Sequence, residues 1–249
     1  MSSGIKYIDL SHSLTSITQI YPSDPEFEST PHATHSKDGY SVQKLSLGTH
    51  TGTHIDAPYH FLAEGQTIDK IPLDHFVGEV MVIDLSGSDS FQVEEGAGSS
   101  TKLKARQRIT WENLESHAQL MQPGCIVLIN TGWSKAYYQT PAYLDHPYLA
   151  PKVASQLLAH GIRVVGVDTL NPDETPSSET GAECVDGFGF HDIFLGAGGL
   201  IAENITNLEE LVVAQKRLPD EKWIVNLVPL NLTGADGSPI RAFAYNLPK

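Results

Sequence analysis

The feature that most constrains this chain is a run of eleven residues, His50 to His60, which reads His-Thr-Gly-Thr-His-Ile-Asp-Ala-Pro-Tyr-His. Its acidic and imidazole side chains all stand at even-numbered positions: His50, His54, Asp56 and His60. Because alternate side chains of an extended segment share one face, these four groups are placed to converge on a point. Imidazole nitrogens and a carboxylate bind divalent transition metals such as zinc or manganese, so the run predicts a metal centre.

A helix would also bring His50 and His54 onto one face, because residues four apart are neighbours there. Gly52 and the threonines beside it weaken a helix, and Pro58 would interrupt it. The helical zinc motif needs a glutamate directly after its first histidine, where this chain has Thr51. The run is therefore expected to be a strand or extended loop that turns near Pro58. A histidine taken alone is more often a surface or core residue, and the matched spacing is what favours the metal.

The composition indicates a globular enzyme that binds neither nucleic acid nor membrane. The length of 249 residues suits one α/β domain or two small ones. Sixteen Lys and Arg against 30 Asp and Glu give a net charge of −14, which disfavours polyanionic partners. No stretch resembles a signal peptide or a transmembrane run, and Cys125 and Cys184 form no disulfide framework. A cytoplasmic enzyme with a small-molecule substrate is expected.

Short apolar runs predict buried strands, and the stretches between them predict helices. The expected strands are Val80–Leu85, Cys125–Thr131, Arg163–Asp168, Trp223–Val228 and Ile240–Tyr245. The expected helices are Trp111–Leu120 capped by Thr110, Lys152–His160 after Pro151 with Gly161 as C-cap, and Leu211–Ala214 behind a capping box of Asn207 and Glu210. Strands and helices do not alternate strictly, which favours an α/β domain over a regular doubly wound sheet.

Two segments are expected to be loops. Ser86–Gln107 is rich in Gly, Ser and charge, and is expected to be a surface insertion within one domain that spans residues 1–249. Gly234-Ala235-Asp236-Gly237 is a turn signal, expected to join the last two strands as a hairpin.

Further ligands are expected from the segment Asp186–Asn204. It contains His191 in a short stretch of helical character, and Glu203 after a glycine-rich turn beside Leu200 and Ile201. If buried, that carboxylate must be paired or bound to a cation. From the residues alone the alternative has nearly equal weight: His191 exposed on a helix, and Glu203 at the start of a surface helix.

The run from His50 to His60 resembles the hallmark of the metal-dependent cyclase family, His-x-Gly-Thr-His-x-Asp-x-Pro-x-His, at every defined position. That family includes bacterial kynurenine formamidases and isatin hydrolase. Further matches run nearly end to end: Asp9-Leu10-Ser11-His12-Ser13-Leu14, Tyr21-Pro22-Ser23-Asp24-Pro25, Asn130-Thr131-Gly132-Trp133, Gly166-Val167-Asp168-Thr169 and Gly234-Ala235-Asp236-Gly237-Ser238-Pro239-Ile240-Arg241. The combination is specific for the family and weakly informative about the substrate.

The resemblance implies roles for these residues and a fold. The implied metal ligands, for one or two Zn²⁺ or Mn²⁺ ions, are His50, His54, Asp56, His191 and Glu203. Asp56 and Glu203 would bridge where two ions bind, and His60 would be the catalytic acid/base. The implied fold is a compact single α/β domain of the swivelling β/β/α type with a mixed sheet, in a homodimer or homotetramer.

The implied reaction is hydrolysis. Water activated by the metal would attack an amide, lactam, N-formyl or ester carbonyl of a small aromatic compound, and His60 would move a proton to the leaving atom. Trp133, Tyr21 and Phe61 are candidate aromatic walls for the substrate, with ordinary packing an open alternative for each. Serine or cysteine catalysis is disfavoured, because the chain has no Gly-x-Ser-x-Gly elbow and Cys125 lies in an apolar run.

Two segments depart from the kynurenine formamidases and isatin hydrolase. Asn171-Pro172-Asp173-Glu174-Thr175 differs from the Ser-Ile-Asp type of segment associated with those enzymes, and Ser86–Gln107 is an addition to a compact formamidase. These departures favour a relative that acts on another small carbonyl compound. Two other functions remain open: a lyase or cyclase that uses the same metal, and a non-catalytic metal-dependent binding protein. The presence of His60 beside a full ligand set argues against the second.

Overall fold

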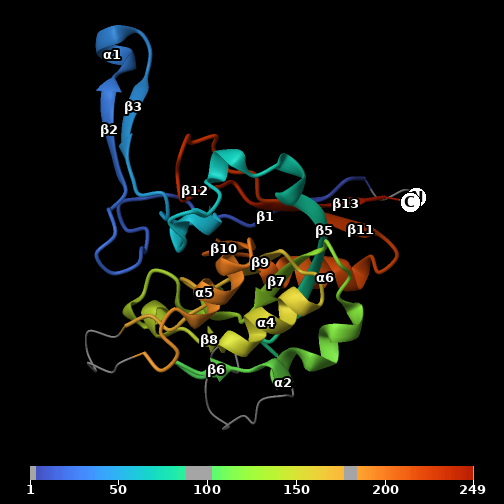
Figure 1. Cartoon of the computed structure of the whole chain (residues 1–249). Helices are drawn as coiled ribbons and strands as arrows, with labels where there is room; N and C mark the ends of the chain where they lie inside the picture. Colours follow the sequence, from blue (N-terminus) through green and yellow to red (C-terminus); the bar gives the residue numbers. More distant parts are fainter. Residues whose placement is uncertain (1–3, 88–102, 177–183, 249) are drawn as a thin grey trace.

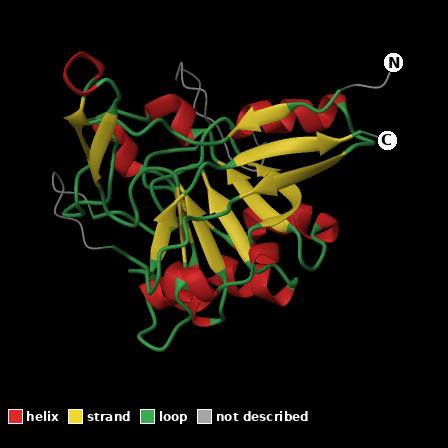
Figure 2. Cartoon of the chain, turned by 90° about the horizontal axis from the view of Figure 1, so that it is seen from above, coloured by secondary structure: helices red, strands yellow, loops and turns green. Residues whose placement is uncertain are grey.

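A mixed sheet of nine strands carries the fold, in the order β1-β13-β11-β5-β7-β9-β10-β4-β12. The computed structural model describes residues 4–87, 103–176 and 184–248. Along the sheet the strands are β1 (Tyr7–Asp9), β13 (Phe243–Leu247), β11 (Lys222–Asn226), β5 (Val77–Asp84), β7 (Ile126–Asn130), β9 (Val164–Val167), β10 (Leu200–Glu203), β4 (His54–Asp56) and β12 (Gly237–Pro239). Figure 2 shows these strands crossing the middle of the molecule with helices on either side.

The four central strands, β5, β7, β9 and β10, run parallel to one another, and the outer strands pair antiparallel. Every residue of β7 and β9 is buried, as expected of parallel strands covered on both faces. Successive residues of β7 enter different cores: Ile126 and Leu128 pack in one cluster, and Val127 and Ile129 pack in the other. The sheet therefore separates two apolar cores.

Helices close both cores. α6 (Leu208–Arg217) packs in the first cluster, and α2 (Trp111–Leu114), α4 (Pro151–Ala159) and α5 (Gly189–Gly196) pack together in the second (Figure 1). The remaining helical segments are short: α1 (His35–Asp38), α3 (Trp133–Tyr137) and the 3₁₀ turns η1 (Pro58–His60), η2 (Ile68–Lys70), η3 (Leu73–His75), η4 (Glu115–Leu120) and η5 (Pro141–Asp145).

All three expected helices exist and begin near the expected residues. Thr110 and Asn113 form a capping box at the start of α2, although the expected helix continues beyond Leu114 only as the 3₁₀ turn η4. Pro151 begins α4, and Gly161 follows that helix with φ +79°. The expected capping box at Asn207 is wrong. Asn207 adopts a left-handed backbone (φ 57°), and its side-chain amide donates to the Asp9 carbonyl instead of capping α6.

The five expected strands all exist, and their ends differ by a few residues from the expected ones. The last two, β11 and β13, do pair with each other antiparallel. The expected tight hairpin turn between them is wrong, because the connection contains a further strand, β12, which pairs with β4 instead. This detour carries Asp236 to the edge of β4.

A two-stranded arm stands out from the body of the molecule (Figure 1). It consists of β2 (Glu28–Ala33) and β3 (Val42–Ser46), whose residues are exposed apart from Ala33. A second small sheet pairs β6 (Arg108–Ile109) with β8 (Tyr148–Leu149). The homodimer or homotetramer implied by the resemblance stays a prediction.

The structure confirms an α/β domain with a mixed sheet, and the sheet curls as one layer between its helices (Figure 2). The swivelling β/β/α arrangement stays a prediction. Most of the expected insertion Ser86–Gln107, residues 88–102, lies outside the described residues. In the described part of the chain, no helix has both the length and the apolar character needed to cross a bilayer.

Candidate metal centre

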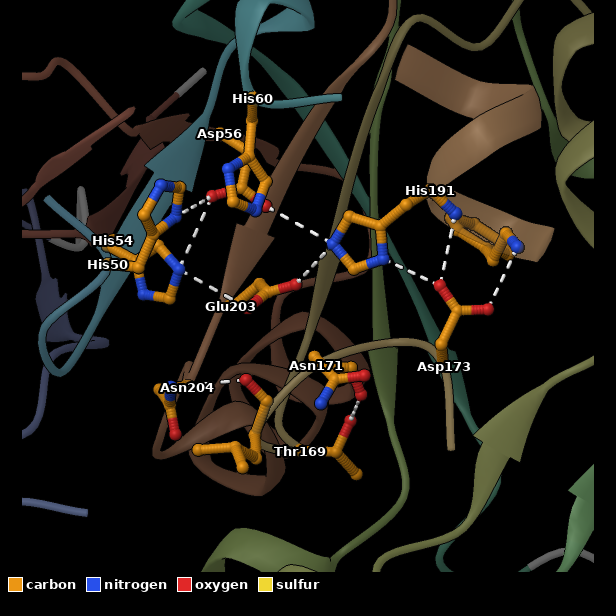
Figure 3. A network of polar contacts seen from close by, with 12 residues as sticks. His50, His54, Asp56, His60, Thr169, Asn171, Asp173, His191, Glu203 and Asn204 are labelled. Carbon is orange, nitrogen blue, oxygen red and sulfur yellow. Dashed lines mark hydrogen bonds and ion pairs between the residues drawn. The ribbon is translucent and has the colours of Figure 1, made fainter. Parts of the chain in front are cut away.

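Four separate elements bring the expected site residues to one place (Figure 3). His54 and Asp56 lie on β4, His60 ends η1, His191 lies in α5, and Glu203 ends β10. The antiparallel register of β4 and β10 sets Glu203 directly opposite His54. Residues directly opposite each other in a sheet share a face, so this register unites two distant parts of the chain.

The turn before β4 requires glycine at position 52. Gly52 has φ +65°, and a Cβ there would meet the Leu14 side chain at 2.5 Å. Beyond the turn, Thr53 donates its hydroxyl to the Asn204 carbonyl at 2.6 Å, and its own carbonyl accepts the Ile240 N–H. These bonds fix β4 between its two neighbours. The run is extended only from His54 to Ala57, between the turn that contains Gly52 and the 3₁₀ turn η1. The predicted turn near Pro58 is confirmed, and the predicted extended conformation from His50 to Thr53 is wrong.

Two histidines face two carboxylates at the centre of the site (Figure 3). His54 Nε2 lies 3.3 Å from Asp56 Oδ1 and 3.2 Å from Glu203 Oε2. His191 Nε2 lies 3.6 Å from Asp56 Oδ2 and 3.1 Å from Glu203 Oε1. Each carboxylate therefore turns one oxygen toward each histidine, which is the arrangement of a ligand shared between two adjacent positions.

Three atoms of this cluster are buried without a hydrogen-bond partner: His54 Nε2, Asp56 Oδ2 and Glu203 Oε1. A buried polar atom left unsatisfied costs about 1–3 kcal/mol, and more for charged groups, so such atoms are rare in native proteins. The ligand atoms of His54, Asp56 and Glu203 lie within 4.8 Å of one another. This donor set fits a divalent cation, which would satisfy all three orphaned atoms at once.

Backbone and carboxylate acceptors fix which ring nitrogen faces the cluster. His54 donates from Nδ1 to the Gly52 carbonyl at 2.8 Å. His191 donates from Nδ1 to Asp173 Oδ2 at 2.6 Å, and Asp173 also accepts the backbone N–H groups of Phe190 and His191. With the proton held on Nδ1, each Nε2 is left as a lone pair for a cation.

His50 and His60 lie on the open side of the cluster. His50 Nδ1 is 2.7 Å from Asp56 Oδ1, and His50 Nε2 is 3.0 Å from Asp236 Oδ2. The same Asp236 oxygen lies 3.4 Å from His60 Nδ1. The ring of His60 stacks on His50, with 3.9 Å between the ring centroids. His60 therefore lies half-buried at the edge of the cluster, with a ring nitrogen within 4.8 Å of ligand atoms of His50 and Asp56.

The carboxylates control the charge of the buried histidines. Burial opposes the charged form of His54, but the Asp56 and Glu203 carboxylates, 3.3 and 3.2 Å from its Nε2, outweigh burial and raise its pKa to about 10. Burial likewise opposes a charged His50, and the Asp56 charge with the Asp236 hydrogen bond raises its pKa to about 9. Burial alone would raise the pKa of Asp56, yet the surrounding histidines hold it well below its usual value. The carboxylates of the site therefore stabilise positive charge placed among them.

A cavity of about 300 Å³ opens beside the cluster. Besides the histidines and Glu203, its lining residues are Tyr21, Asp24, Phe61, Leu170, Asn171, Phe188 and Asn204. Phe61 stacks on His191 with 4.7 Å between centroids, and Phe188 stands edge-on to Phe61 at 5.3 Å. Aromatic rings therefore form one side of the cavity and the polar cluster forms its floor.

The structure places two of the three expected aromatic walls, Tyr21 and Phe61, in the cavity lining, and not Trp133. Trp133 is 2% exposed, and its indole N–H donates to the Tyr143 carbonyl. Its ring packs beside Tyr137 in a separate small core. Core packing, the alternative left open from the residues, accounts for it.

Sequence reasoning did not single out several residues of the site. Phe188 lies in Asp186–Asn204, the segment from which further ligands are expected, and Asp173 lies in Asn171–Thr175, the segment that departs from the kynurenine formamidases and isatin hydrolase. Asp236 stands in one of the motifs that match the family, where its Gly-rich surroundings indicated only a turn. The contacts that give these residues their importance join parts of the chain far apart in sequence.

Comparisons with known proteins identify the family and proteins of the same fold. A family model described as "Putative cyclase" matches residues 8–174. A kynurenine formamidase of Salinibacter ruber is 29% identical over 243 residues, covering 97% of this chain and 98% of the relative. The isatin hydrolase A of Ralstonia solanacearum superposes with a TM-score of 0.76 at 25% identity, covering 97% and 92% of the two chains. An isatin hydrolase bound to the product analogue thioisatinate reaches a TM-score of 0.80 at 20% identity, covering 98% and 93%.

Proposed function

The chain belongs to the cyclase family, and we propose that it is a metal-dependent hydrolase of a small aromatic amide, lactam or N-formyl compound. The observation that carries the proposal is the set of three orphaned, buried atoms on His54, Asp56 and Glu203. Without a cation, three buried polar atoms that make no hydrogen bond would lower the stability of the folded protein. Two relatives that match over nearly the full length are named a kynurenine formamidase and an isatin hydrolase, which supports hydrolysis as the reaction class.

Five residues would hold the metal, one ion or two, of zinc or manganese: His50, His54, Asp56, His191 and Glu203. The split of the Asp56 and Glu203 oxygens between the two central histidines supports a shared role for both carboxylates. A bound divalent cation supplies Lewis-acid chemistry, because it polarises a carbonyl and lowers the pKa of a water ligand from about 15.7 to about 7.

His60 is proposed to move the proton to the leaving nitrogen or oxygen. It lines the cavity, contacts Asp236 through Nδ1, and is left out of the central cluster of buried ligands. Histidine is the commonest general acid/base near neutral pH. Because His60 stacks on His50, its ring is held beside the place where the scissile bond would lie.

The cavity walls favour a planar aryl group. Tyr21, Phe61 and Phe188 offer ring surfaces within the cavity, and Leu170 adds an aliphatic side. Flat rings stack on such walls with centroid separations of roughly 4.5–7 Å. N-formylkynurenine and isatin are therefore the first compounds to test, together with simple lactones. Asn171, which lines the cavity, belongs to the segment that departs from both groups of enzymes, and this favours a substrate that differs from both compounds in its substituents.

The experiment is turnover of these compounds in oxygen-18 water with zinc or manganese present. Hydrolysis must place one labelled oxygen in the acid product, whereas a lyase or ring-closing cyclase leaves the product unlabelled. The proposal predicts labelled formate from an N-formyl substrate or a labelled carboxylate from a lactam. Unlabelled product from a converted substrate contradicts it, and binding without conversion of any compound supports a non-catalytic protein.

A further inference from the structure

Asp236 lies in the turn before β12, and its side chain points into the site. We propose that it positions both His50 and His60. Its role would be to fix which nitrogen of each ring carries the proton. The inference rests on the proposed function and adds to it a residue beyond the ligands and His60. Asp236 acts through these two histidines and is therefore a positioning residue.

One oxygen makes both contacts. Asp236 Oδ2 lies 3.0 Å from His50 Nε2 and 3.4 Å from His60 Nδ1. The two rings stack on each other at 30°, so their edges point to a common acceptor. The Asp236 side chain is 34% exposed, whereas the side chains of Asp56 and Glu203 are nearly or fully buried. A carboxylate in that position orients ligands and remains reachable from solvent.

The backbone holds Asp236 in place. Its carbonyl accepts the Ala57 N–H at 2.8 Å, and the next residue, Gly237, pairs with Asp56 in the β12–β4 ladder. A Cβ at Gly237 would lie 2.8 Å from His50 Cε1, so only glycine lets this strand approach the ring so closely. The position of the carboxylate relative to β4 is therefore set by main-chain bonds.

The Asp236 carboxylate can fix the position of the proton on each of the two imidazole rings. A neutral imidazole has one N–H and one lone pair. The Nδ1 atom of His50 faces Asp56 and the cluster, so a His50 that offers this lone pair to a cation must carry its proton on Nε2, where Asp236 accepts it. In the same way, a His60 that donates from Nδ1 to Asp236 has its Nε2 free to exchange a proton with substrate. One anion thus selects the working tautomer of both rings.

The test uses Asp236→Ala with Asp69→Asn as matched control. Asp69 accepts the Gly234 N–H at 3.0 Å and so supports the same turn without touching either histidine. At saturating metal, Asp236→Ala is expected to lower kcat by about 10- to 100-fold with KM changed less than about threefold, and to weaken zinc affinity by about 10- to 100-fold. Added acetate is expected to restore part of kcat, because the site is open to solvent.

The proposal is contradicted if Asp236→Ala keeps wild-type kcat and zinc affinity, or if Asp69→Asn loses as much of both. It is also contradicted if acetate restores nothing to an Asp236→Ala protein that folds and binds metal, since a merely structural side chain gives that result. Should the wild-type protein hydrolyse none of the compounds, the proposed function fails separately. Zinc affinity of the two variants, measured by titration calorimetry, then decides the positioning role on its own.

Discussion

His60 differs from the other histidines of its run in both exposure and element. Its side chain is 29% exposed, whereas that of His54 is 2% exposed, and it lies on η1 beyond Pro58 instead of on β4. The regular spacing of the run predicts one face for all four groups. The chain leaves the extended conformation at Pro58, and His60 returns to the site by stacking on His50.

His60→Ala is expected to keep its metal and to lose turnover by about 10²- to 10⁴-fold, the usual contribution of a positioned acid/base. Tyr59→Phe is a matched control, because Tyr59 is the exposed neighbour of His60 on the same turn. Metal content by elemental analysis and kcat are measured on both variants. Full turnover in a metal-loaded His60→Ala protein would remove the acid/base role.

Some of the site residues could be predicted from the sequence. The residue types and spacing of His50, His54 and Asp56 need only one short segment, and their convergence is confirmed. Asp173 and Asp236 were not predictable as site residues, because their contacts with His191 and the other histidines form only when distant segments meet. No spacing rule relates residues that far apart.

Helix α5 is tied to the site at its first turn. Asp173 accepts the backbone N–H groups of Phe190 and His191 and the ring Nδ1–H of His191. An anion at a helix start satisfies free donors and interacts favourably with the helix dipole. One side chain therefore both begins the helix and orients its histidine.

Asp173→Asn is expected to weaken metal affinity by about 10- to 100-fold, since the amide no longer supplies a negative acceptor to the histidine. Asp192→Asn, an exposed change on the same helix, should leave affinity unchanged. Competition with a chromophoric chelator measures both. Equal affinities for the two variants would show that the Asp173 carboxylate does not act on His191.

The strands that could be predicted from the sequence are those whose burial produces a continuous apolar run. β7 and β9 are buried along their whole length, so their residues form apolar runs that are visible in the sequence. β10 and β12 were missed because they are short and carry or adjoin polar site residues. The capping box at Asn207 failed because a tertiary acceptor, the Asp9 carbonyl, takes the side-chain amide.

At the scale of the whole molecule, two histidines outside the metal site are held in the neutral form: His146, which is buried, and His12, which is partly buried. Burial lowers the pKa of His146 to about 4, and burial does the same for His12. His146 donates from Nδ1 to the Pro147 carbonyl, so its Nε2 accepts the Thr175 hydroxyl proton at 2.8 Å. Protonating His146 would break this chain of bonds.

The unfolded chain binds protons at these histidines with a pKa of about 6.5, so it holds more protons than the folded protein between about pH 6.5 and 4. Stability is therefore complete above that window and falls as the pH drops through it. Asp168 acts in the opposite sense, because burial raises its pKa to about 6 and its contribution is lost as the pH rises toward that value.

The contribution of His146 is isolated by comparing His146→Gln with the wild type in urea unfolding between pH 4.5 and 7, without metal. The variant is expected to be less stable at pH 7 and to show a shallower loss toward acid, by up to about 1.4 kcal/mol per pH unit for one proton. His117, which is only partly buried, provides the control variant His117→Gln. Parallel pH profiles for wild type and His146→Gln would contradict a buried neutral histidine.

The proposed activity depends on a metal ion at the buried cluster of His54, Asp56, His191 and Glu203. Its most direct test is the activity of chelator-stripped protein toward N-formylkynurenine, isatin or a lactone, measured before and after zinc or manganese is titrated back. We expect no turnover in the stripped protein, and we expect turnover to recover until one or two ions are bound per chain. Full turnover by protein that elemental analysis shows to be metal-free would contradict it.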